Sequence, residues 1–123
     1  MDIKFSALLV DDELELVAAL AERLGYRGIR ADVAASGSEA LEKMEQTAYD
    51  VVLLDLKLPG MSGVEVLRKI RQAYPHVPVI LITGHGAPID VPDLDTGEAF
   101  DYLPKPVDLE ILVATMQKAV DRT

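Results

Sequence analysis

Short apolar runs alternate with helical patterns along the chain, and this alternation restricts the fold more than any other feature. Strand-length runs separated by helices predict βαβ units and a parallel sheet. Most of the runs are apolar at every position, which is typical of strands covered by helices on both faces. The 123 residues suffice for one domain, residues 1–123, with its own core. The predicted strands are Phe5–Val10, Ile29–Val33, Val51–Leu54, Val77–Ile82 and Phe100–Leu103.

The segments between these strands carry helical spacing and helix-end signals. The apolar stripe after the first strand consists of Leu16, Val17, Leu20 and Leu24, and we expect Gly25 to end that helix. A serine followed three residues later by a glutamate can bond the free N–H groups at a helix start. Two such capping boxes are Ser36 with Glu39 and Ser62 with Glu65. Asp108 is the expected N-cap of a last helix.

One segment departs from this pattern. Ala87–Gly97 lies where a fourth helix of a five-fold βα repeat would run, yet it contains Pro88, Pro92 and three aspartates. Because a proline in a helix interior costs about 3 kcal/mol, we expect a short or irregular fourth helix, or a loop, in this stretch.

The composition excludes several classes of function. The chain has no cysteine, which excludes a disulfide scaffold and thiolate metal sites. Its net charge of −9 argues against binding of nucleic acid or of an anionic membrane surface, and favours a cation or a basic partner. The apolar run Ala7–Val10 is cut off by acids and is too short for a signal peptide or a membrane span, so we expect a cytoplasmic protein.

Acidic residues stand where two of the predicted strands end. Asp11 and Asp12 follow the first strand, and Asp55 follows the third. If these strands are neighbours in a parallel sheet, their carboxyl ends share one edge and the three carboxylates converge. A single such aspartate is more commonly a solvated strand end or a helix N-cap, but here all three directly terminate apolar runs. Mg²⁺, which prefers oxygen ligands, would offset their mutual repulsion.

A hydroxyl and an amine are expected at the same edge. Thr83 ends the fourth strand and Lys105 follows the fifth. Taken singly, they are a strand-end hydroxyl and a surface lysine, but together with the acids they form an anion site. No histidine or cysteine base directly follows a strand, so a hydrolase triad is not indicated. A carboxylate can instead act as the nucleophile and form an acyl phosphate.

Four motifs in this order make the chain resemble the receiver domain of two-component response regulators, the CheY-like family. The motifs are Leu9–Glu13, Asp55–Gly63, Leu81–Gly84 and Asp101–Pro106. The resemblance covers nearly the whole chain. It implies an α/β fold with a doubly wound, five-stranded parallel sheet in order 2-1-3-4-5, the flavodoxin/CheY-like three-layer sandwich.

The resemblance implies a role for each matching residue. Asp55 would accept the phosphoryl group from the phosphohistidine of a histidine kinase or phosphotransfer protein. Asp11, Asp12 and the backbone carbonyl of Lys57 would bind Mg²⁺ together with Asp55. Lys105 would pair with the phosphate.

The remaining matches concern a conformational switch. Thr83 would move onto the phosphoryl group, and Tyr102 would turn inward into the space that it leaves. An acyl phosphate carries more negative charge and more acceptor oxygens than a carboxylate, and these draw Thr83 and Lys105 toward it. The bond between Lys105 and Pro106 is expected to be cis, as in the family.

The leading hypothesis is a phosphoacceptor signalling module that catalyses only its own phosphorylation and dephosphorylation. The run Leu81–Gly86 looks most like receivers of transcription regulators, so an effector domain or protein is expected elsewhere. Alternatives are an interaction-only pseudo-receiver and the receiver of a hybrid histidine kinase. A Mg²⁺-dependent phosphohydrolase normally needs an Asp-x-Asp pair, whereas Leu56 and Lys57 follow Asp55. A homodimer on activation is a further option.

Overall fold

Five parallel strands form one sheet in the order β2-β1-β3-β4-β5, which confirms the predicted fold class. The computed structural model describes residues 3–84 and 99–122. Ala87–Gly97, predicted to be a short or irregular helix or a loop, lies outside these residues. The strands are β1 Phe5–Val10, β2 Ile29–Ala34, β3 Val51–Asp55, β4 Val79–Thr83 and β5 Asp101–Pro104.

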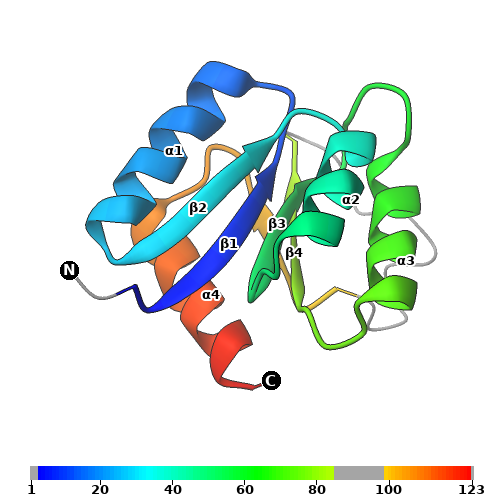
Figure 1. The fold of residues 1–123 in the computed structure, drawn as a ribbon. Coiled ribbons are helices and arrows are strands. Elements are labelled where there is room, and N and C mark those ends of the chain that lie inside the picture. The colour runs from blue at the N-terminus through cyan, green and yellow to red at the C-terminus, as the bar shows by residue number, and fades with distance from the viewer. Residues whose placement is uncertain (1–2, 85–98, 123) are drawn as a thin grey trace.

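Helices cover the sheet on both faces and give a three-layer sandwich (Figure 1). In the described residues, α1 and α4 pack on one face, and α2 and α3 pack on the other. None of these helices is long and apolar enough to span a bilayer. The helices are α1 Leu14–Tyr26, α2 Gly37–Gln46, α3 Gly63–Ala73 and α4 Leu109–Asp121.

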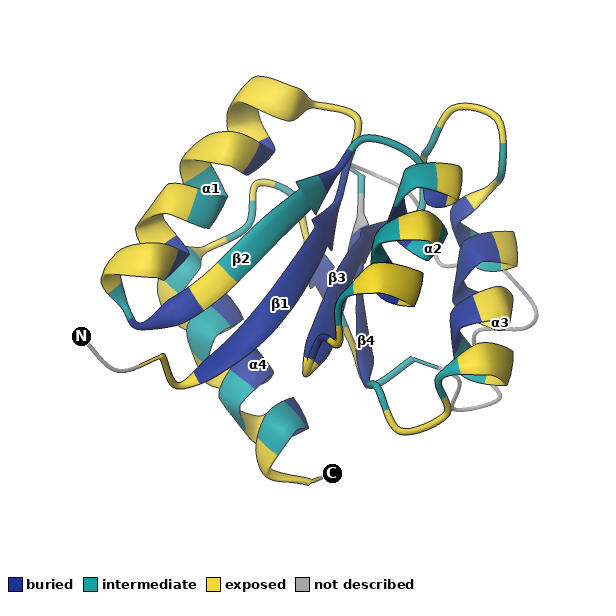
Figure 2. Cartoon of the chain, viewed as in Figure 1, coloured by how far each residue is buried: buried dark blue, intermediate teal, exposed yellow. Residues whose placement is uncertain are grey.

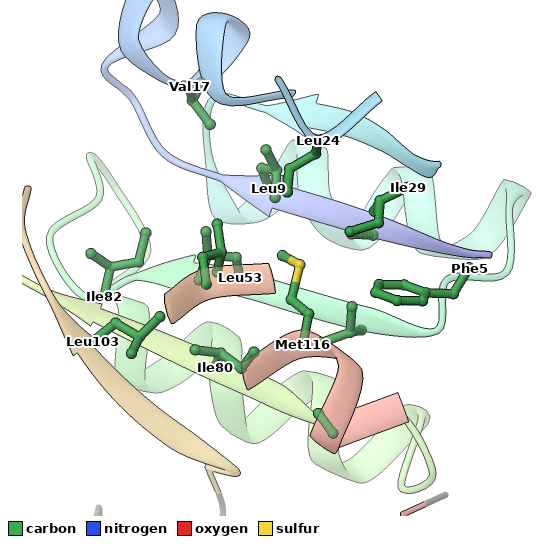
Figure 3. Close-up of a cluster of buried hydrophobic side chains, with 14 residues drawn as sticks. Phe5, Leu9, Val17, Leu24, Ile29, Leu53, Ile80, Ile82, Leu103 and Met116 are labelled. Atoms are coloured by element: carbon green, nitrogen blue, oxygen red, sulfur yellow. The ribbon is translucent and has the colours of Figure 1, made fainter. Parts of the chain in front are cut away.

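The two faces of the sheet bury separate apolar clusters, which explains why the central strands are apolar throughout. Successive side chains of a strand point to opposite faces. Leu9 therefore joins the cluster under α1 and α4, while Leu8 joins the cluster under α2 and α3. Figure 2 shows β1 and β3 buried along their whole length, and Figure 3 shows Met116 of α4 among the strand side chains of the first cluster.

The predicted helix starts are confirmed. The hydroxyl of Ser36 accepts a 3.2 Å bond from the Glu39 backbone N–H, and α2 begins at the next residue. Ser62 and Asp108 cap α3 and α4 in the same way. These caps satisfy N–H groups that would otherwise have no partner within the helix.

Two details of α1 were predicted wrongly. The helix passes through Gly25 and ends at Tyr26, and the chain turns at Gly28, whose φ of 82° suits a residue without a side chain. Leu16 was placed in the buried stripe but is 55% exposed, because the buried line of the helix runs through Val17 and Leu24. Neighbouring helix positions differ by about 100°, so Leu16 faces away from the sheet.

Candidate phosphoacceptor and metal site

Three carboxylates converge at the carboxyl edge of the sheet, as the sequence predicts. Asp55 is the last residue of β3, and Asp11 follows directly after β1, the neighbouring strand. Carboxylate oxygens of Asp11, Asp12 and Asp55 all lie within 4.8 Å of one another. Strand order alone brings them together, because parallel neighbours end on the same side of the sheet.

The three acids differ in their surroundings. The side chains of Asp11 and Asp55 are only 4% exposed, whereas Asp12 is exposed. Each buried carboxylate accepts one bond from the backbone two residues later. The Glu13 N–H lies 2.9 Å from Asp11 Oδ1, and the Lys57 N–H lies 3.0 Å from Asp55 Oδ1. The second oxygen of each buried carboxylate, Oδ2, pairs with Lys105.

The Lys105 ammonium neutralises part of this charge. Its Nζ lies 2.9 Å from Asp55 Oδ2, 3.1 Å from Asp11 Oδ2 and 2.6 Å from Glu13 Oε1. The peptide bond to Pro106 is cis. Sequence reasoning missed Glu13 as a partner of this lysine, although its place as the third acid of the Asp11–Glu13 run was a usable signal.

Burial and neighbouring groups shift the pKa of both Lys105 and Asp11. Burial by itself would lower the pKa of Lys105, but its bonds to three carboxylates outweigh burial and hold the pKa above the usual lysine range. Burial raises the pKa of Asp11 above its usual value, although the Glu13 N–H and the Lys105 ammonium favour the charged carboxylate. One ammonium thus stays charged among four acids and leaves the pocket with a negative excess.

The pocket opens to solvent beside Gly84. A Cβ placed on Gly84 would lie 3.9 Å from the Cδ, Cε and Nζ atoms of Lys57, so the Lys57 side chain borders this opening. His85, the next residue in the sequence, lies outside the described residues. The pocket is lined by Asp12, Glu13, Leu16, Asp55, Lys57, Gly84, Lys105 and Pro106.

The start of α3 is pressed against the loop that carries Asp55. The Gly63 N–H donates a 3.2 Å bond to the Leu56 carbonyl, and the Leu56 N–H bonds Ile82 of β4. A Cβ on Gly63 would lie 2.5 Å from the Leu56 Cα and 2.8 Å from the Asp55 carbonyl oxygen. Only glycine permits this approach, which fixes the backbone next to Asp55.

Two further predicted residues lie on the strands beyond Asp55. Thr83 is the last residue of β4, but its side chain lies outside the part of the structure that is described. Tyr102 lies on β5, opposite Leu81, and packs half-buried against the cluster under α2 and α3.

The acid group fits a hard divalent cation. It offers carboxylate oxygens from three residues, two of them held by backbone N–H groups, and it carries excess negative charge. Mg²⁺ binds such oxygen ligands and keeps several waters, which suits a pocket that is open on one side.

Magnesium is therefore expected to stabilise the fold. At about ten times its dissociation constant, Mg²⁺ should raise the free energy of unfolding by about 1.4 kcal/mol, measured by urea denaturation. Asp55→Asn should raise the metal-free value by about 1 kcal/mol, because one carboxylate fewer repels its neighbours while Lys105 keeps Asp11 and Glu13. The same variant should respond less to Mg²⁺. A stability that neither change alters would contradict the mutual repulsion of these acids.

Comparison with known proteins agrees with this geometry. Residues 7–117 match the family model of the response regulator receiver domain. The chain is 40% identical over 114 residues to the uncharacterized transcriptional regulatory protein YkoG of Bacillus subtilis, covering 92% of this chain and 50% of that protein. It is 42% identical over 118 residues to the sensory transduction protein RegX3 of Mycolicibacterium smegmatis, covering 95% and 51%.

A solved structure shows the same fold. The response regulator receiver domain protein of Clostridium thermocellum superposes with a TM-score of 0.88 at 32% identity, covering 96% of this chain and 95% of that one. The chain spans about half the length of the two curated relatives. The four motifs, the strand order and the match over residues 7–117 agree, and the chain belongs to the response regulator receiver domain family.

Proposed function

We propose that this chain is the phosphoacceptor module of a two-component phosphorelay, with Asp55 as the residue that carries the phosphoryl group. One observation carries the proposal. The Asp55 carboxylate lies within 4.8 Å of two other acids that can hold a cation, and 2.9 Å from the Lys105 ammonium. A nucleophile, a cation site and a fixed positive charge meet at one open pocket.

The residues divide the transfer step among them. An Asp55 oxygen attacks the phosphorus of a phosphohistidine, the P–N bond breaks, and the imidazole nitrogen keeps the electron pair and takes a proton from solvent. Asp11, Asp12, Asp55 and the Lys57 carbonyl would hold Mg²⁺, which supplies charge neutralisation at the phosphoryl oxygens. The Lys105 ammonium, already at Asp55, pairs with a phosphoryl oxygen as it arrives.

The donor is proposed to be a histidine kinase or a phosphotransfer protein. The mouth of the pocket supports a protein donor, because the exposed side chain of Leu16 lines it and the exposed Leu14 lines the adjoining hollow at the start of α1. Exposed leucines next to a reactive carboxylate favour contact with a protein surface over a small charged substrate.

The output is proposed to be a change of conformation read by an effector. Thr83 at the end of β4 and Tyr102 on β5 would form the switch, which draws on the resemblance and on the packing of Tyr102. The relatives named above are a transcriptional regulatory protein and a sensory transduction protein, each about twice as long as the match. We propose that this chain is likewise the receiver part of a regulator that acts in the cytoplasm, with the effector region outside this chain.

The test is intact-mass measurement after incubation with Mg²⁺ and acetyl phosphate. We expect the chain to gain the mass of one phosphoryl group, with no gain in Asp55→Asn or in the presence of EDTA. Asp50→Asn is the matched control, because Asp50 lies in the loop before β3 and bonds Ser6, away from the pocket. It should be phosphorylated like the wild type.

A second donor separates the alternatives. If acetyl phosphate and a phosphorylated histidine kinase both leave the mass unchanged, the chain is an interaction-only receiver. Continuous release of phosphate from an added phosphomonoester would instead indicate a phosphohydrolase.

A further inference from the structure

Glu13 occupies a helix-capping position but does not cap its helix. It is the N-cap residue of α1, yet its side chain makes no capping bond, in contrast to Ser36, Ser62 and Asp108 at the other helices. Instead its Oε1 lies 2.6 Å from Lys105 Nζ, the shortest of the three carboxylate contacts that the described residues make with that amine. The Glu13 carboxylate is thus directed to the pocket and not to the free N–H groups of its own helix.

Glu13 also differs from the other two partners of Lys105. Its side chain is 56% exposed, whereas those of Asp11 and Asp55 are 4% exposed. The carboxylates placed to share a cation are those of Asp11, Asp12 and Asp55. Glu13 is therefore the partner that keeps its oxygens available when a metal ion occupies the others.

We propose that Glu13 is a positioning residue that holds the Lys105 ammonium at the mouth of the pocket while Asp11 and Asp55 bind the metal. The inference rests on the proposed phosphoacceptor function. Without Glu13, the partners that remain to Lys105 among the described residues are the two carboxylates that the metal needs, and the metal must displace it. With Glu13, the ammonium keeps a charged partner and remains beside Asp55, where the phosphoryl group arrives.

The backbone supports this role. The Glu13 N–H donates to Asp11 Oδ1, so the turn that holds Glu13 is tied to the buried carboxylate itself. The position of Glu13 relative to the pocket is then fixed by the same bond that orients Asp11. Lys105 reaches Glu13 from the residue that directly follows β5.

The test is the Mg²⁺ affinity of the whole chain, measured by calorimetry without any phosphodonor. Glu13→Gln should weaken binding about five-fold, because the ammonium loses its charged alternative. Glu13→Asp keeps the charge, but the shorter side chain favours the helix cap over Lys105, so we expect a similar loss. Glu15→Gln removes one exposed charge from the first turn of the same helix and should change the affinity less than about two-fold.

Two results would overturn the inference. In the first, Glu13→Asp binds like the wild type while Glu13→Gln and Glu15→Gln weaken binding equally, which would mean that only the general negative field matters. In the second, the wild type binds no Mg²⁺. The proposed function fails separately. If Asp55 accepts no phosphoryl group but the affinities follow the expected order, the role of Glu13 stands and the phosphoacceptor assignment falls.

Discussion

Lys105→Met should lower the free energy of unfolding in metal-free buffer by about 2 kcal/mol. The substitution keeps the apolar stem but removes the ammonium that pairs with Asp11 and Asp55, whose side chains are 4% exposed. Two nearly buried carboxylates then face each other without a counter-charge. The loss in free energy of unfolding is smaller than for a fully buried ion pair, because the pocket is open to solvent. Urea denaturation in the presence of EDTA measures the difference.

Magnesium separates this explanation from a simple packing defect. If the loss comes from unpaired charge, saturating Mg²⁺ should restore more stability to Lys105→Met than it adds to the wild type. Lys57→Met removes a lysine from the lining of the same pocket, and we expect a loss below about 0.5 kcal/mol. Equal losses in the two lysine variants, or no extra response to Mg²⁺, would show that Lys105 does not hold the acids together.

Gly63→Ala should lower the free energy of unfolding by about 3 kcal/mol. The added Cβ would lie 2.5 Å from the Leu56 Cα and 2.7 Å from the Leu56 carbonyl oxygen. Both atoms belong to the backbone, so no rotamer change relieves the contact. Either α3 or the loop after Asp55 must move, and phosphorylation of Asp55 should slow as well. Denaturation curves and intact-mass time courses measure the two effects.

Gly25→Ala is the matched control for that substitution. Gly25 lies inside α1, and a Cβ placed there meets no atom within 4 Å. Alanine is the better helix former, so we expect a gain of about 0.5–1 kcal/mol and unchanged phosphorylation. A loss at Gly25 comparable to that at Gly63 would mean that the close approach of α3 to the Asp55 loop is not the cause.

Much of the fold follows from local patterns in the sequence. Strands that are covered by helices on both faces need no alternation of polar and apolar residues. The central strands could therefore be recognised as continuous hydrophobic segments. Serine and aspartate caps marked three helix starts because capping depends on only a few neighbouring residues. The order of the strands was implied by the family resemblance, since pairing in a parallel sheet depends on contacts between distant parts of the chain.

The local errors have physical reasons. Gly25 was expected to end α1 because glycine favours helix ends. The packing of Val17 and Leu24 against the sheet outweighs that preference, and the helix continues for one more residue, to Tyr26. The fourth strand was predicted from Val77 but begins at Val79, after Pro78, which has no N–H to donate to a sheet.

The acids of the site were predictable and their partners were less so. Asp11 and Asp55 could be located because each ends an apolar run. The parallel pairing of β1 and β3 then brings the two carboxylates to the same edge of the sheet. The three-way pairing of Lys105 was not predicted, because it depends on how far a lysine and a glutamate from distant segments reach into the same space. The role of Gly63 was equally invisible, since a close backbone approach leaves no mark in residue type beyond the glycine itself.

The position of the phosphoryl group tests the central claim most directly. After incubation with acetyl phosphate and Mg²⁺, borohydride reduces an aspartyl phosphate to the alcohol, so the modified residue becomes homoserine. Tandem mass spectrometry of the digested chain then locates it. We predict homoserine at position 55 and at neither Asp11 nor Asp12. Homoserine at position 11 or 12, or a phosphorylated chain without it at position 55, would contradict the account.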